Sequence, residues 1–144
     1  MSETIAIASD HAGVALKEAL KAQLLALGVV PEDLGAHSKD SVDYPDYAEK
    51  LCKFIVGKKA TRGVLICGSG IGMSIAANRH KGIRAALCRS VADAELSRQH
   101  NNANVLCLGE RSTSAEDAKE ILKRFLATPF EGGRHEARVS KMDK

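Results

Sequence analysis

The stretch with the clearest capacity for chemistry is residues 63–74, which read GVLICGSGIGMS. A short apolar segment ends at Cys67 and is followed by glycine at positions 68, 70 and 72. This pattern predicts a strand, a tight loop and the start of a helix, whose first backbone N–H groups have no acceptor inside the helix. Because those N–H groups lie at the positive end of the helix dipole, they attract anions. The sequence therefore predicts an anion site with a thiol at its rim.

The spacing of this loop does not match a nucleotide-binding motif. A dinucleotide fingerprint needs glycine at position 73, which is Met73, and the next apolar segment ends at Arg89 rather than at an acidic residue. No Gly-Lys-Ser/Thr sequence of a P-loop is present. The remaining interpretation is a backbone nest for a smaller anion, such as a phosphate or an oxyanion. A tight turn that binds nothing is the alternative.

Cys67 and His100 each have two interpretations. A thiol near a helix N-terminus becomes more acidic than its usual pKa of about 8.5 and can then act as a base or a nucleophile. Alternatively, Cys67 is a small buried hydrophobe at the end of a strand. His100 comes at the expected end of a helix, before two asparagines, where it is either an acid/base group or a local cap. Spacing alone leaves these alternatives open.

Three further sets of residues could contact an anionic ligand. Asp10 follows the first apolar segment and is expected to cap a helix, while His11 is well placed to hold an anion. Arg134 and Arg138 are four residues apart and share one helical face, so they form either a phosphate clamp or part of a solvated tail. Tyr44 precedes a proline and is expected to start a helix, with a wall of the active site as the less favoured interpretation.

Apolar segments of strand type alternate with amphipathic segments along the whole chain. The expected strands are 5–8, 29–34, 64–66, 83–88 and 105–108, and the expected helices are 16–27, 44–57, 73–79, 91–99 and 115–126. Such alternation predicts an α/β domain with a five-stranded parallel sheet and helices on both faces. Ligands of these folds bind beyond the carboxyl ends of the strands, where Asp10, Cys67 and Arg111 are expected.

The composition fits one globular domain spanning residues 1–144, with 44% apolar and 27% charged residues. The 21 Lys and Arg against 18 Asp and Glu give a net charge of +3, which is too weak to indicate nucleic acid. The apolar segments are too short to span a bilayer, and the N-terminus lacks the pattern of a signal peptide. The four cysteines form no C-x-x-C pair, so no zinc site is predicted. We therefore expect a cytoplasmic protein without a nucleic-acid or membrane partner.

In this order the motifs resemble those of ribose-5-phosphate isomerase B, within the wider family that includes galactose-6-phosphate isomerase subunits. The resemblance covers nearly the whole chain and rests on residues 9–13, 43–46, 67–78, 82–86, 98–106 and 132–135. It implies a Rossmann-like three-layer sandwich and an aldose–ketose isomerase that uses no metal and no other cofactor. It also implies a homodimer or a dimer of dimers with shared active sites, in which the segment 130–144 reaches toward a partner subunit.

The resemblance also implies roles for individual residues. Cys67 would be the base that moves a proton between C2 and C1 of the open-chain sugar, with help from the Ser69 hydroxyl. The N–H groups of the loop would stabilise the enediolate, and they belong to Gly68, Ser69, Gly70, Ile71 and Gly72. His100, helped by Asp10, would open the furanose ring. The phosphate would be bound by His11, Arg134 and Arg138, and the pocket would be lined by Asn101 and Arg111.

One position departs from the pattern of this family. Ser69 stands where many members with a cysteine base have threonine, so the hydroxyl is kept but the methyl group that stiffens its rotamer is lost. Another branch uses a glutamate later in the loop helix, where this chain has Ser74 and Ile75. The main expectation is interconversion of D-ribose 5-phosphate and D-ribulose 5-phosphate. The alternatives are the same chemistry on allose 6-phosphate or galactose 6-phosphate, and a non-catalytic sugar-phosphate-binding subunit.

Overall fold

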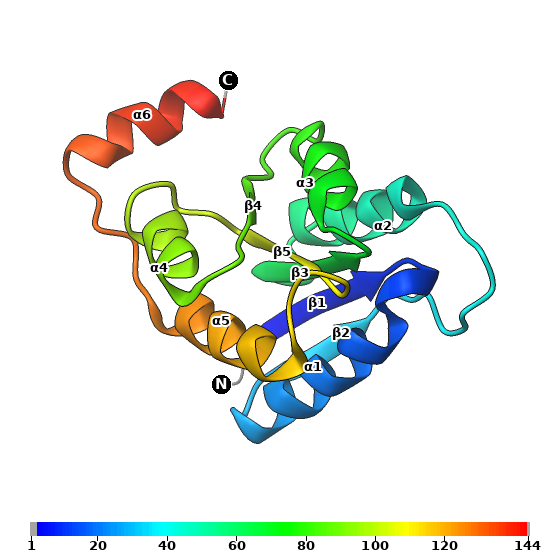
Figure 1. Ribbon diagram of the computed structural model, residues 1–144. Coiled ribbons are helices and arrows are strands. Elements are labelled where there is room, and N and C mark those ends of the chain that lie inside the picture. Colours follow the sequence, from blue (N-terminus) through cyan, green and yellow to red (C-terminus); the bar gives the residue numbers. More distant parts are fainter. Residues whose placement is uncertain (1–2, 144) are drawn as a thin grey trace.

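Five parallel strands form one sheet in the computed structural model, which describes residues 3–143 (Figure 1). The strands pair in the order β2-β1-β3-β5-β4, so β3 lies at the centre. They are β1 (Thr4–Ser9), β2 (Val30–Asp33), β3 (Arg62–Cys67), β4 (Ala85–Leu87) and β5 (Val105–Gly109). Every pair in the sheet is parallel, which confirms the predicted sheet.

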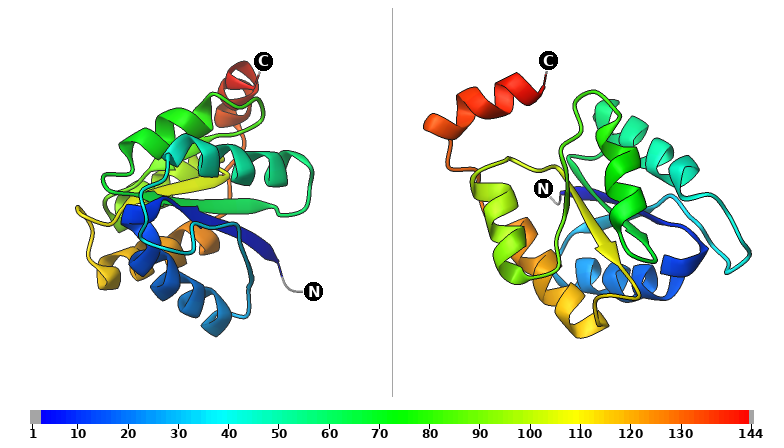
Figure 2. Two further views of the ribbon diagram at one scale, coloured as in Figure 1. Left: turned by 90° about the vertical axis from the view of Figure 1, so that its right-hand side faces the viewer. Right: turned by 45° about the horizontal axis from the view of Figure 1, so that its top comes forward.

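Helices cover both faces of this sheet, as the two views of Figure 2 show. They are α1 (Val14–Ala26), α2 (Tyr44–Val56), α3 (Ile71–Asn78), α4 (Val91–Gln99) and α5 (Ala115–Ala127), with the short 3-10 turn η1 (His11–Gly13) before α1. Helices α4 and α5 begin where Ser90 and Ser114 accept hydrogen bonds from the N–H groups of Asp93 and Asp117. A sixth helix, α6 (Arg134–Met142), lies outside these two layers. The three-layer α/β sandwich is thus confirmed.

The core is divided into two clusters by the sheet. Ile5 and Ile7 of β1 are fully buried in a cluster with residues of α1, α4 and α5, whereas Ala6 and Ala8 are fully buried on the side of α2 and α3. Successive side chains of a strand point to opposite faces, so a strand buried on both faces must be apolar at every position. Within residues 3–143, no helix is both long enough and apolar enough to cross a bilayer.

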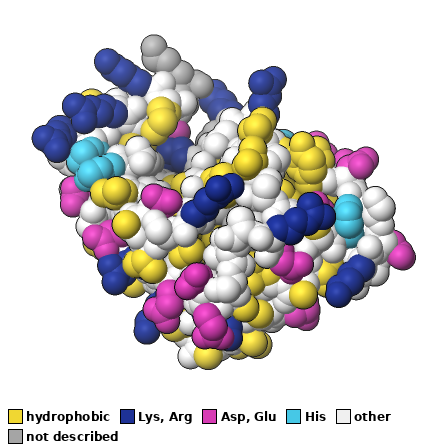
Figure 3. All heavy atoms as spheres, in the orientation of Figure 1, with side chains coloured by type: hydrophobic (Ala, Val, Ile, Leu, Met, Phe, Trp, Pro, Cys, Tyr) yellow, Lys and Arg dark blue, Asp and Glu magenta, His cyan; other side chains and the backbone are white. Residues whose placement is uncertain are grey.

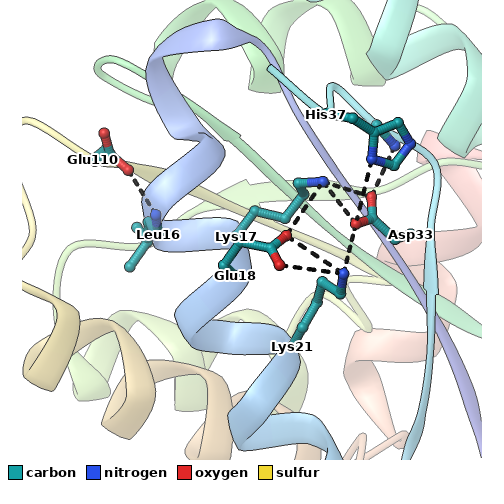
Figure 4. A network of polar contacts seen from close by, with 8 residues as sticks. Leu16, Lys17, Glu18, Lys21, Asp33, His37 and Glu110 are labelled. Atoms are coloured by element: carbon teal, nitrogen blue, oxygen red, sulfur yellow. Dashed lines mark hydrogen bonds and ion pairs between the residues drawn. The ribbon is translucent and has the colours of Figure 1, made fainter. Parts of the chain in front are cut away.

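A buried ion-pair network ties the edge strand β2 to α1 (Figure 4). The ammonium group of Lys17, whose side chain is 1% exposed, lies 2.6 Å from Asp33 Oδ1, and Lys21 Nζ lies 2.8 Å from Asp33 Oδ2. Asp33 Oδ1 also accepts from the N–H of Gly35 at 2.9 Å. Burial by itself would raise the pKa of Asp33, but the hydrogen bonds from Lys17, Lys21 and Gly35 outweigh it and hold the pKa at about 2.

Replacing Asp33 with asparagine is expected to lower the free energy of unfolding by about 3–5 kcal/mol, because it leaves the buried Lys17 with only the exposed Glu18 carboxylate, 3.7 Å away, as a counter-charge. In the wild type, the folded-state pKa lies below the ordinary value of 3.8, so the stabilisation by Asp33 is present above that value and is lost as the pH falls toward about 2. Urea denaturation at neutral pH and along an acid series measures both effects. The matched control is Glu18→Gln, since the Glu18 side chain is 58% exposed and its loss is expected to change little. Equal stability of Asp33→Asn and wild type would contradict the prediction.

Candidate active site

The loop between β3 and α3 holds the Cys67 thiol under the first turn of the helix. Gly70 has φ of 80°, a left-handed conformation that glycine adopts without strain, and α3 begins at the next residue. Cys67 Sγ accepts a hydrogen bond from the N–H of Gly70 at 3.2 Å, and Ser69 Oγ accepts from the N–H of Ile71 at 3.2 Å. The predicted helix start at residue 73 was therefore two residues late, because Gly70 turns the chain into the helix early.

The other three cysteines are core side chains. Burial raises the pKa of Cys52 to about 12 and that of Cys88 to about 11. Burial also raises the pKa of Cys107 well above its usual range. These three groups remain thiols at neutral pH and pack as small apolar side chains. Cys67 alone among the four cysteines faces the hollow at the carboxyl edge of the sheet.

This hollow has a volume of about 560 Å³ and lies where four loops converge. Its lining comprises Asp10, Tyr44, Cys67, Gly68, Ser69, Ile71, Gly72, Ile75, Arg111 and Ser112. Residue 72 must be glycine for the Tyr44 ring to approach, because a Cβ there would lie 2.6 Å from Tyr44 Cζ. The Arg111 guanidinium lies against Gly68, with Nη1 2.8 Å from the place of a Cβ. The residues expected at the ends of β1, β3 and β5 therefore do come together.

The side chains of Asp10 and His11 each accept a hydrogen bond from a backbone N–H group. Asp10 Oδ1 accepts from the N–H of Ala12 at 2.9 Å, so the predicted cap exists, and the carboxyl group also lines the hollow. His11 Nδ1 accepts from the N–H of Val42 at 3.1 Å. Because Nδ1 accepts, the neutral imidazole carries its proton on Nε2, where it can donate to a ligand.

Glu110 is a structural member of this site that was not predicted from the sequence. Its N–H donates to the Cys67 carbonyl at 3.0 Å, and its Oε1 accepts from the N–H of Leu16 at 2.7 Å (Figure 4). Gly13 precedes α1 and has no side chain to cap it, so Glu110 supplies the acceptor from 94 residues farther along the chain. The missing local cap at Gly13 was the one signal that a distant acceptor was needed.

His100 lies near the amino-terminal ends of the strands, whereas Cys67 lies at their carboxyl-terminal ends. It ends α4 and precedes Val105, the first residue of β5, whereas Cys67 pairs with Gly109, the last residue of β5. A five-residue strand separates its two ends by about 13 Å. Asn101 lies beside His100 and lines a different hollow, of about 380 Å³. A single copy of the chain therefore does not bring His100 and Asn101 to the thiol.

Arg134 and Arg138 lie on the exposed face of α6, and their charges act on His135. The buried face of α6 carries His135 and Val139, and the His135 ring stacks on the His100 ring with centroids 4.3 Å apart. Burial, followed by the charges of His100 and Arg134, lowers the pKa of His135. Figure 3 shows Lys and Arg side chains gathered over α6, and Figures 1 and 2 show α6 on the far side of the molecule from η1.

The predicted site residues thus form two groups. The strand-end group comprises Asp10, His11, Tyr44, Cys67, residues 68–72 and Arg111, and all of these except His11 and Gly70 line the hollow. The α4–α6 group comprises His100, Asn101, Arg134 and Arg138. Each group combines residues that could bind a sugar phosphate, and only the first holds a thiol at the N-terminus of a helix.

Comparisons with known proteins point to one family. A family model described as Ribose/Galactose Isomerase matches residues 5–142. Ribose-5-phosphate isomerase B of Escherichia coli is 45% identical over 135 residues, which cover 94% of this chain and 91% of that protein. The crystal structure of a ribose 5-phosphate isomerase from Thermotoga maritima has 55% identity and a TM-score of 0.97, covering 99% of both chains. Ribose 5-phosphate isomerase B of Anaplasma phagocytophilum has 51% identity and a TM-score of 0.93, covering 98% of this chain and 97% of that one. The chain belongs to the ribose/galactose isomerase family.

Proposed function

We propose that this protein is an aldose–ketose isomerase that interconverts D-ribose 5-phosphate and D-ribulose 5-phosphate through an enediolate. The observation that carries the proposal is the position of the Cys67 thiol, which lies beside the N–H groups of a helix start in a hollow of about 560 Å³. Proton transfer between adjacent carbons needs a base next to donors that stabilise an oxyanion. The names of the relatives from E. coli and T. maritima supply the five-carbon substrate.

In the proposed reaction, the Cys67 thiolate removes the proton from C2 of the open-chain aldose. The C2–H electrons form the C1–C2 double bond, and negative charge develops on the C1 oxygen. The backbone N–H groups of residues 68–72 stabilise that charge. The Ser69 hydroxyl moves a proton from the C2 oxygen to the C1 oxygen. The Cys67 thiol then returns its proton to C1, which leaves the ketose and the thiolate.

A second copy of the chain is proposed to complete each site, in a homodimer or a dimer of dimers. Ring opening and phosphate binding are assigned to the α4–α6 group. Within one copy, this group lies at the opposite end of the strands from Cys67. Gly132 and Gly133 have φ of 70° and 55°, and they lead the chain into α6 outside the helix layers. In this arrangement His100 of one copy, with Asp10 of the other, opens the furanose. Arg134 and Arg138 bind the phosphate together with His11 of the other copy, and Asn101, Arg111 and Tyr44 line the pocket.

The proposed function is tested by following ribose 5-phosphate in heavy water by NMR. The expected result is formation of ribulose 5-phosphate with deuterium entering at the exchanging carbons, because the thiol proton equilibrates with solvent. Parallel assays with allose 6-phosphate and galactose 6-phosphate compare kcat/KM for six-carbon substrates, and a higher value for either would reassign the substrate. Binding of the sugar phosphates without any isomerisation or exchange would favour a non-catalytic binding subunit.

Arg134→Ala and Arg138→Ala are each expected to raise KM by roughly 10- to 100-fold with a smaller change in kcat, since each removes a charge-assisted hydrogen bond to the phosphate. Initial rates over a range of ribose 5-phosphate concentrations measure the two constants separately. The matched control is Lys141→Ala, which removes a positive charge from the last turn of α6. If KM stayed unchanged in both arginine variants, the phosphate would be bound elsewhere.

A further inference from the structure

Three side chains with metal-ligating atoms meet where the end of α4 faces the start of α6. They are His100, Glu131 and His135, and their ligand atoms all lie within 4.8 Å of one another. Glu131 Oε1 is 3.8 Å from Nε2 of His100 and 3.6 Å from Nε2 of His135. One carboxylate oxygen therefore lies near both imidazole nitrogens, which is the arrangement that a shared cation would use.

The backbone holds these residues together without any ligand. The N–H of Glu131 donates to the carbonyl of Gln99 at 3.1 Å, which fixes Glu131 beside His100. The N–H of His135 donates to the carbonyl of Gly132 at 3.1 Å, and the His135 side chain is only 9% exposed. The three donors thus come from two segments that are already docked, so an ion would not have to order the chain.

We propose that His100, Glu131 and His135 form a binding site for a divalent transition-metal ion of the zinc class, and that the occupied site withdraws His100 from catalysis. Two imidazole nitrogens and one carboxylate oxygen suit Zn²⁺, Ni²⁺ or Co²⁺, and they leave a fourth position for water. Mg²⁺ and Ca²⁺ prefer oxygen ligands and are not expected to bind. The inhibitory part of this proposal rests on the proposed role of His100, whereas the binding part does not.

Binding requires the exposed side chains of His100 and Glu131 to move, while the backbone stays in place. Ligand atoms around a tetrahedral zinc ion lie about 3.3 Å apart, which is slightly closer than the separations of 3.6 and 3.8 Å found here. The planes of the two imidazole rings differ by 14°, so the His100 ring must turn out of the stack to aim its lone pair at the ion. The side chains of His100 and Glu131 are 40% and 50% exposed and can move, while the buried His135 stays in place.

The charges around the site make it selective. Arg134 and Arg138 on α6 repel a dication, and Glu131 attracts it. Only ions with a strong preference for imidazole are expected to overcome that repulsion. A bound phosphate on the two arginines would reduce the repulsion, so metal and phosphate are expected to bind together more tightly than either alone.

The binding part is tested by titrating the reduced full-length protein with Co²⁺, followed by its visible absorption, and with Zn²⁺, followed by calorimetry. One ion per chain with a nitrogen and oxygen ligand spectrum is expected. Glu131→Gln and His135→Asn are each expected to weaken binding at least about tenfold, while the control His80→Asn binds normally. Because His135 is buried, the exposed Glu131→Gln variant decides the outcome if His135→Asn does not fold. Absence of binding, unchanged affinity in Glu131→Gln, or a thiolate-to-cobalt charge-transfer band would overturn the site.

The inhibitory part is tested by isomerase assays in the presence of Zn²⁺. Turnover is expected to fall as the site fills and to return after chelation, and Glu131→Gln is expected to raise the inhibition constant by the factor found in the titration. Binding at the site without loss of turnover would overturn the inhibitory coupling and the ring-opening role of His100. Failure to bind any ion would leave the proposed isomerase function untouched, so the two proposals fail in different experiments.

Discussion

Replacing Cys67 with alanine is expected to lower kcat by roughly 100- to 10,000-fold, the usual contribution of a positioned general base. The Cys67 sulfur is the side-chain atom that the Gly70 N–H holds at the rim of the hollow, and a methyl group there cannot accept a proton. Sugar-phosphate affinity is expected to change little, because the proposed phosphate contacts come from His11, Arg134 and Arg138. The variant is therefore expected to bind substrate and fail to convert it.

The NMR assay in heavy water measures this loss directly, since both isomerisation and exchange of the carbon-bound proton require the base. Cys88→Ala is the matched control, because Cys88 is equally a buried cysteine but lies in the core cluster with α1, α4 and α5. Its variant is expected to lose some stability and to keep its kcat. A Cys67→Ala protein with near-normal kcat would show that another group is the base.

Two inactive variants are expected to restore activity when they are combined in the proposed dimer. In a heterodimer of Cys67→Ala with His100→Ala, one site receives both altered groups and the other receives an intact Cys67 and an intact His100. Such a heterodimer is expected to show roughly half of the wild-type activity per dimer, since a twofold symmetric assembly has two equivalent sites. Co-expression with two different tags, purification through both and a rate measurement test this prediction.

The matched control for this experiment pairs two variants from the same group. A heterodimer of Cys67→Ala with Asp10→Asn has one altered residue of the strand-end group in each site, so it is expected to stay inactive. Activity in the first heterodimer alone would support shared sites. If neither heterodimer were active, each chain would have to complete its own site, and the assignment of His100 and the arginines would need revision.

Local patterns in the sequence were sufficient to predict the strands, the helices and the edge where the hollow forms. β1, β3 and β5 are continuous apolar segments. Right-handed crossovers between parallel strands place the carboxyl ends of all three strands at the same end of the sheet. The same rule also fixes the end of the sheet at which His100 lies. A helix between two parallel strands carries the chain back to the amino-terminal ends of the strands. A residue at the end of α4 must therefore lie away from Cys67, which is at a carboxyl-terminal end.

Contacts between segments that are distant in sequence could not be predicted, because they depend on the order of strands in the sheet. β5 lies between β3 and β4, so the N–H of Glu110 reaches the Cys67 carbonyl and its carboxylate reaches α1. Periodicity and turn signals are local and do not encode that order. The stacking of His100 on His135 depends in the same way on the path of residues 128–133, which have no regular pattern.

The cap of α1 has a consequence for the order in which the protein forms during synthesis. The acceptor for the Leu16 N–H is Glu110, so a ribosome must add 94 further residues before that helix end can be completed. Until then, β3 of the nascent chain has no β5 beside it, and α1 has an open N-terminus. The carboxylate that closes α1 arrives on the same loop as Arg111, so this long-range contact forms together with the wall of the hollow beside Cys67.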